Sequence, residues 1–166
     1  MLFDYWRRIH PPHGLPGRQH FDPAAVTRLL PNLVLVEVHR APLRFRYRLL
    51  GSRIDAIHGK SLVGLWLDEA YANHPNADAM LSEYTRVAET RQPIWRRSDP
   101  KVVPDPGCRS IEVLRLPLAA DGATVDMVLG LTLYFDAAGQ PVESIAYRAF
   151  GHGFAESIRG ADDDKR

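Results

Sequence analysis

Hydrophobic and polar residues alternate along several stretches of this chain in the way that half-buried β-strands require. Within residues 44–50, Phe45, Tyr47 and Leu49 fall on one side and three arginines fall on the other. A period of two places every second side chain of a strand on the same face. Alternation of this kind, together with apolar runs elsewhere, predicts strands at 33–39, 44–50, 94–103, 111–118 and 125–135.

Turn residues between these segments indicate how the predicted strands pair. Ala41-Pro42 separates the first two strands, and Asp121-Gly122 separates the last two. Short turns of this composition join antiparallel neighbours in a hairpin. Asp99-Pro100 interrupts the segment 94–103, and a strand that contains proline is suited to the edge of a sheet.

A period of three to four residues predicts the helices. Residues 2–9 carry an apolar stripe, a short helix capped by Ser52 turns Ile54 and Ile57 inward, and the strongest stripe covers 76–91. Asp22-Pro23 is typical of a helix start, because the carboxylate can accept from free N–H groups and proline fits the first turn. Strands grouped at both ends of the chain with helices between them favour an α+β fold, with an antiparallel sheet and helices against one face.

Composition narrows the function classes. The chain has 166 residues, a formal charge of +1, and 45% hydrophobic and 25% charged residues. These are globular proportions without the broad positive field of a dedicated nucleic-acid binder, and the apolar runs are far too short to span a membrane. We therefore expect a cytoplasmic protein that binds neither nucleic acid nor membrane. Cys108 is the single cysteine, which excludes an internal disulfide framework.

The sequence contains no recognisable catalytic motif. It lacks Gly-x-Ser-x-Gly and a Gly-rich phosphate loop, and its strand carboxylates are isolated from one another. His10, His13 and His20 lie close together, but without cysteine or carboxylate support they favour a polar surface over a metal site. We expect no catalytic and no metal-binding residues.

Basic side chains form one candidate interaction surface. Alternating arginines of this kind can contact phosphate or an acidic partner. On an edge strand, however, they more often provide solvation and prevent edge-to-edge pairing. The residues concerned are Arg44, Arg46, Arg48, Arg96, Arg97 and Lys101.

Large side chains near the predicted junction of sheet and helices suggest a small-molecule pocket. Tyr47, Trp66, Met80, Tyr84 and Trp95 combine apolar bodies with polar or polarizable groups, which suits a site that orients a ligand. A simply filled core explains them equally well. If a pocket exists, we expect it between the sheet and the helices 52–59 and 76–91. Its predicted lining is Tyr47, Ile54, Ile57, Met80, Tyr84 and Leu131.

The order of elements and several short motifs resemble a family of short bacterial PAS-like proteins. The resemblance covers residues 3 to 136 and is moderately specific through the order and spacing of its motifs. The matching residues are Tyr5-Trp6, Leu15-Pro16-Gly17-Arg18, Asp22-Pro23, Leu30-Pro31-Asn32, Tyr47-Arg48-Leu49-Leu50-Gly51-Ser52, Gly59 and Gly64.

This resemblance implies a five-stranded antiparallel sheet and a role in sensing or protein contact. It divides the chain into an N-terminal helical extension at 1–31, a PAS-like domain at 32–150 and a C-terminal tail at 151–166. It implies no catalytic residues. We expect neither flavin nor haem, because Cys108-Arg109 lies after the long helix and not on the helical side as in flavin-binding relatives. The haem-binding relatives carry a histidine on the long helix, and here His74 merely precedes it.

The resemblance also implies a homodimer, since PAS-like domains often pair through an N-terminal helix and the outer face of the sheet. A helix as short as 2–9 must dock on some surface to be stable. Val128, Gly130, Thr132 and Tyr134 form the expected receiving face. The predicted interface residues are Leu2, Phe3, Trp6, Ile9 and Tyr134.

The leading functional interpretation is therefore a non-enzymatic sensory or regulatory module of signal transduction. It would bind a small apolar or amphipathic ligand, pass its output to a separate signalling protein, or do both. The alternative is a small α+β enzyme with an apolar cavity and a histidine or carboxylate as acid or base. A buried titratable pair in the cavity would favour the enzyme, and a few hydrogen-bonding groups in an apolar cavity would favour the sensor.

Overall fold

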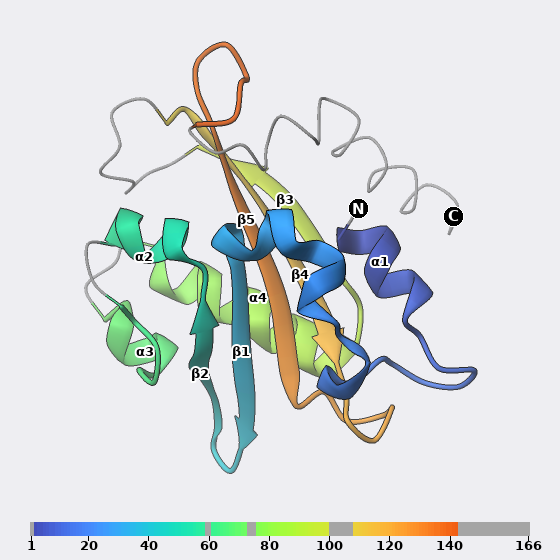
Figure 1. Cartoon of the computed structure of the whole chain (residues 1–166). Helices are drawn as coiled ribbons and strands as arrows, with labels where there is room; N and C mark the ends of the chain where they lie inside the picture. The colour runs from blue at the N-terminus through green and yellow to red at the C-terminus, as the bar shows by residue number, and fades with distance from the viewer. Residues whose placement is uncertain (1, 59–60, 73–75, 100–107, 143–166) are drawn as a thin grey trace, which may run out of the picture.

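A five-stranded antiparallel sheet organises the protein (Figure 1), as the sequence predicts. The computed structural model describes residues 2–58, 61–72, 76–99 and 108–142. The strand order is β2-β1-β5-β4-β3, so the two predicted hairpins are confirmed and are joined through β1 and β5. The strands are β1 (Leu33–Arg40), β2 (Leu43–Leu50), β3 (Ile94–Ser98), β4 (Ser110–Leu118) and β5 (Met127–Phe135).

Helical segments cover both faces of this sheet. In Figure 1 the longest helix lies behind the sheet and the N-terminal segments lie in front of it. Residues of α1, η2 and the strands contribute to one hydrophobic core, so the described part of the N-terminal extension, residues 2–31, packs against the sheet. The helical elements are α1 (Leu2–Arg8), η1 (Arg18–His20), η2 (Pro23–Asn32), α2 (Ser52–His58), α3 (Leu67–Ala70) and α4 (Ala77–Thr90).

Local signals in the sequence explain where several elements begin and end. The Asp22 carboxylate accepts from the backbone N–H of Ala24 at 2.9 Å, and Pro23 begins η2, which is a 3₁₀ helix. Helix α4 ends where Arg91 adopts a left-handed conformation with φ of 62°. β3 forms an edge of the sheet, as the Asp99-Pro100 interruption predicts. The end of the predicted strand 94–103 and the predicted tail 151–166 lie outside the described residues.

The end of β2 departs from the predicted alternation. Phe45 and Tyr47 are buried as expected, but Leu49 is 46% exposed and Leu50 is buried instead. Leu35 pairs with Leu49 while the next residue, Val36, pairs with Tyr47, so β2 contains one extra residue at Arg48. This β-bulge reverses the faces of the residues that follow it, because side chains alternate with a period of two.

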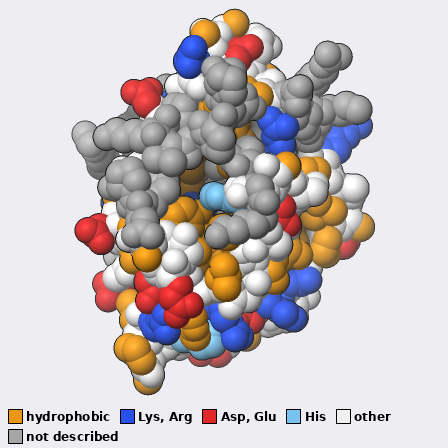
Figure 2. All heavy atoms as spheres, turned by 90° about the vertical axis from the view of Figure 1, so that its left-hand side faces the viewer, with side chains coloured by type: hydrophobic (Ala, Val, Ile, Leu, Met, Phe, Trp, Pro, Cys, Tyr) orange, Lys and Arg blue, Asp and Glu red, His pale blue; other side chains and the backbone are white. Residues whose placement is uncertain are grey.

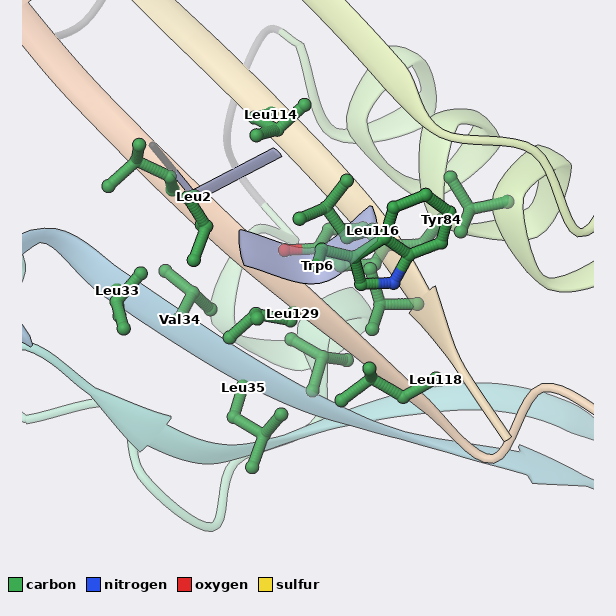
Figure 3. Packing of buried hydrophobic residues seen from close by; sticks show 14 of the residues in the cluster. Leu2, Trp6, Leu33, Val34, Leu35, Tyr84, Leu114, Leu116, Leu118 and Leu129 are labelled. Atoms are coloured by element: carbon green, nitrogen blue, oxygen red, sulfur yellow. The ribbon is translucent and has the colours of Figure 1, made fainter. Parts of the chain in front are cut away.

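The face on which α1 packs also differs from the prediction. Trp6 donates its indole N–H to the carbonyl oxygen of Pro117 in β4 at 3.0 Å. Figure 3 shows Trp6 in front of β4, beside Leu116, and Leu2 in front of the neighbouring strand β5. The expected receiving face, which includes Val128, Gly130, Thr132 and Tyr134, points instead toward α4.

The apolar stripe of α1 is covered by its own chain. Leu2, Phe3 and Trp6 are buried, and Ile9 packs against the same core. These residues therefore do not form the exposed surface that the predicted dimer interface requires. Tyr134, the fifth predicted interface residue, is buried on the opposite side of the sheet.

We predict that Trp6→Ala lowers the free energy of unfolding by about 3–5 kcal/mol, because it removes a large buried ring and leaves the Pro117 carbonyl without its donor. Urea denaturation of both proteins measures the difference. Trp66→Ala is the matched control, because Trp66 is only half-buried beside the edge strand, and its loss should be smaller. Equal losses in the two variants would contradict the packing described for α1.

Candidate ligand-binding cavity

A cavity of about 400 Å³ lies between the sheet and the helices α2 and α4. Its position is the one predicted from the sequence. A volume of this size is within the range of small-molecule sites. The lining residues are Val34, Tyr47, Leu50, Ile54, His58, Tyr71, Asn76, Ala79, Met80, Glu83, Tyr84, Arg96, Ser98, Asp99, Ile111, Val113, Arg115, Thr132 and Tyr134.

Four of the six predicted lining residues contribute to this cavity. They are Tyr47, Ile54, Met80 and Tyr84. Leu131 does not, because it is in register with Leu114 on the sheet face that packs against α1. Ile57 belongs to α2, but its side chain lies outside the described residues.

The two tryptophans considered for the pocket also lie elsewhere. Trp95 pairs with Leu114 in the ladder, which puts it on the face of α1. The ring of Trp66 lies beneath the guanidinium of Arg44, with 4.2 Å between the Arg44 carbon Cζ and the ring centroid. Both rings are therefore structural parts of the domain and not lining residues.

Arg115 is one of the lining residues that the sequence does not predict. It lies in the middle of β4 and is only 5% exposed. Its carbon Cζ is 4.7 Å from the centroid of the Tyr84 ring, a distance typical of a cation–π contact. The available signal was a charged residue within 111–118, a segment that is otherwise apolar on both faces apart from Glu112.

Gly130 provides the space that the Arg115 side chain occupies. The two residues face each other in the β4–β5 ladder. A Cβ atom built on Gly130 would lie 2.9 Å from Nη1 of Arg115 and 3.3 Å from the Cβ of Val34. A larger residue at this position would therefore push the guanidinium away from the sheet.

The positive charge of Arg115 has no counter-charge among the described residues. Its Nε and Nη1 atoms are buried and make no hydrogen bond. Arginine does not lose its proton in proteins, so the side chain cannot become neutral. A buried charge without a partner costs several kcal/mol unless something compensates it. The positive charge of Arg115 in the cavity is therefore not compensated by any described side chain.

Four tyrosines surround the same space, and burial raises the pKa of each of them: Tyr47, Tyr71, Tyr84 and Tyr134. For Tyr84 the pKa rises to about 12. Their hydroxyl groups are consequently protonated at neutral pH and do not neutralise Arg115. The Tyr47 hydroxyl donates to that of Tyr71 at 3.1 Å, and Nε2 of His58 lies 3.3 Å from the Tyr71 oxygen.

Glu83 and Arg96 form the other charged part of the lining. Nε of Arg96 donates to Oε1 of Glu83, and its Nη1 donates to the hydroxyl of Ser98. The Glu83 carboxylate is thus neutralised by an arginine on the neighbouring strand β3. This pairing leaves Arg115 as the unmatched cation of the described lining.

The basic residues proposed for phosphate or an acidic partner are largely paired with the chain's own carboxylates. Arg44 forms two hydrogen bonds with Asp68, and Arg46 forms two with Glu37. Figure 2 views the molecule from the side of α2, α3 and β2, and basic and acidic side chains gather there. Arg48 lies 3.7 Å from Glu37, and Arg96 and Arg97 have acidic neighbours as well. Lys101 lies outside the described residues.

The remaining sequence candidates have local structural contacts. The Nδ1 atom of His10 lies 2.9 Å from the Trp6 carbonyl oxygen, and Nδ1 of His20 accepts from the Gly17 N–H at 2.9 Å. The part of the chain that the structure describes contains no cluster of three or more possible metal ligands. Cys108 is buried just before β4.

Comparison with known proteins identifies the family. A family model described as PAS domain matches residues 1–133. The chain belongs to the PAS domain family. The match includes the N-terminal segments, in keeping with their burial against the sheet of this PAS domain. A search of curated proteins found no match.

PAS membership supports a sensory or regulatory role in general. It confirms the resemblance inferred from the motifs and the α+β fold predicted with it. Among the described residues of this PAS domain, no helix is long and apolar enough to cross a membrane.

We predict that Arg115→Met raises the free energy of unfolding of the ligand-free protein by roughly 1–4 kcal/mol, because it replaces an unpaired buried charge with an apolar side chain of similar length. Chemical denaturation after ligand removal by refolding measures this change. Arg40→Met is the matched control and should destabilise, because Arg40 donates to the carbonyl oxygens of Ala88 and Val125. A large loss of stability in Arg115→Met would contradict the account of its charge.

Proposed function

We propose that this PAS domain is a non-enzymatic sensor that binds a small organic molecule in the cavity between the sheet and α4. The observation that carries the proposal is a cavity of about 400 Å³ whose described lining combines seven aliphatic residues and four tyrosines with eight polar or charged residues. Sites of this kind bury an apolar ligand body and use the polar groups to orient it. The phenol hydroxyls and Arg115 are the orienting groups.

The arrangement of polar groups favours a sensor over the alternative enzyme. An acid–base mechanism needs a titratable group that is free to exchange a proton near the substrate. In the described lining, the Glu83 carboxylate is paired with Arg96, and the raised pKa of Tyr84 keeps its hydroxyl protonated. Glu83 and Tyr84 can bind and orient a ligand, and they supply no matched acid and base. His58, whose Nε2 lies 3.3 Å from the Tyr71 hydroxyl oxygen, is the lining residue through which the alternative enzyme would act.

A separate signalling protein is the proposed recipient of the output. The backbone of Tyr47, a lining residue, accepts from the N–H of Gly64 and donates to the carbonyl of Leu65. Leu49, Val63 and Leu65 are exposed hydrophobic residues of this region. A shift of Tyr47 on ligand binding would therefore reach an apolar surface through two hydrogen bonds.

We predict that the neutral probe 2-naphthylmethanol binds the wild-type protein and that Ile111→Trp weakens this binding at least about tenfold, since a larger side chain at a lining position occupies the cavity. Isothermal titration calorimetry on ligand-free protein measures the affinities. Leu65→Trp adds an indole at an exposed position outside the cavity and should bind like the wild type. Failure of the wild type to bind the probe, or equal weakening in both variants, would overturn the proposed function.

A further inference from the structure

We propose that the ligand of this cavity is an organic monocarboxylate whose carboxylate pairs with Arg115. This inference rests on the proposed function and adds the charge and the head group of the ligand. Its basis is a guanidinium that lines the cavity, is 5% exposed and has two buried nitrogens without hydrogen-bond partners.

The described lining carries two arginines, Arg96 and Arg115, and two carboxylates, Glu83 and Asp99, so its formal charge is zero. The placement of these charges still points to an anion at Arg115, because no described carboxylate forms an ion pair with it. Arg96 is neutralised by Glu83, whereas the guanidinium of Arg115 lies against the aromatic face of Tyr84 and pairs with no carboxylate of the described residues. A cation–π contact offsets about 0.5–2 kcal/mol, which is less than the cost of burying an unpaired ion. A bound anion supplies the remaining compensation and gains a charge-assisted hydrogen bond in a partly water-excluded site.

The number of charges favours a single carboxylate over a phosphate. One unmatched cation balances one negative charge, whereas a phosphate group carries about −1.5 to −2 at neutral pH. Asp99 belongs to the same lining and would repel a second negative charge. The guanidinium is also planar, and its parallel N–H groups match the two oxygens of a carboxylate.

The position of Arg115 places the carboxylate at the sheet and the apolar body toward the helices. Arg115 is anchored between Gly130 on the neighbouring strand and the ring of Tyr84 on α4. Around this point the lining is formed by Tyr47, Ile54 and Met80, which offer aromatic and aliphatic surface. The structure therefore matches an acid with a hydrophobic ring or short chain better than a small hydrophilic acid.

The test compares two probes with the same ring system, 2-naphthoate and 2-naphthylmethanol, by isothermal titration calorimetry on ligand-free full-length protein. Because a hydrogen bond to a charged group is worth more than one to a neutral group, we expect the wild type to bind the acid roughly 10- to 100-fold more tightly. Arg115→Met should lose this preference and bind the acid and the alcohol with similar affinity. Arg115→Lys should keep part of the preference, because it retains the charge without the planar geometry.

Arg48→Met is the control for net charge. It removes the same formal charge from a side chain that is 65% exposed, and it should retain the full preference for the acid. If the wild type binds both probes equally, or if Arg115→Met keeps the preference, the carboxylate assignment is wrong while the proposed function stands. If 2-naphthyl phosphate binds more tightly than 2-naphthoate, the assignment of a singly charged carboxylate is wrong. If neither naphthyl probe binds, the proposed function fails and the inference fails with it.

Discussion

The buried guanidinium of Arg115 is the constraint on which the cavity depends. A permanent positive charge in the centre of an apolar sheet face is costly, and the surrounding residues accommodate it. Gly130 leaves room for Nη1, the Tyr84 ring lies against the guanidinium, and the tyrosine hydroxyls stay protonated. An apolar residue at position 115 would avoid the cost of burying a charge in the folded protein. The place of Arg115 in the lining of a 400 Å³ cavity is the observation that supports the proposed carboxylate ligand.

The opposite face of the sheet, which packs against α1, supports the side that carries Arg115 and the cavity. Helix α1 and the leucines of β4 and β5 form a filled core on one side, where Trp6 is tied to the Pro117 carbonyl. The sheet face that packs against α1 is thus filled, while the cavity lies on the face toward α4. Sites that bind ligands are commonly held by a rigid scaffold whose stability lies elsewhere in the fold.

The sequence predicted the fold more completely than the site because the two depend on different signals. Alternation in 44–50, the turn at Asp121-Gly122 and the apolar stripe of 76–91 are local signals, and they are sufficient to predict the strands, the hairpins and the long helix. The inward side of the last strand was less determined, because both of its faces are apolar, and Leu131 was consequently assigned to the wrong one. The bulge at Arg48 had no clear signature and moved Leu49 to the surface.

Arg115 shows why part of the site escaped sequence reasoning. A single arginine within an apolar strand is visible in the sequence, but its lack of a counter-charge depends on contacts between β4, β5 and α4 that lie far apart in the chain. The paired arginines of β2 show the opposite outcome. Their alternation was conspicuous, and the structure neutralises Arg44 and Arg46 with nearby carboxylates. A conspicuous pattern of charges in the sequence thus does not show whether those charges are free to bind a ligand.

A crystal structure of the wild-type protein grown with 2-naphthoate tests the central claim most directly. The account predicts one naphthyl ring in the cavity against Tyr84 and the carboxylate within hydrogen-bond distance of the Arg115 guanidinium. A structure in which a carboxylate of the protein itself forms an ion pair with the Arg115 guanidinium, with no ligand in the cavity, would contradict it.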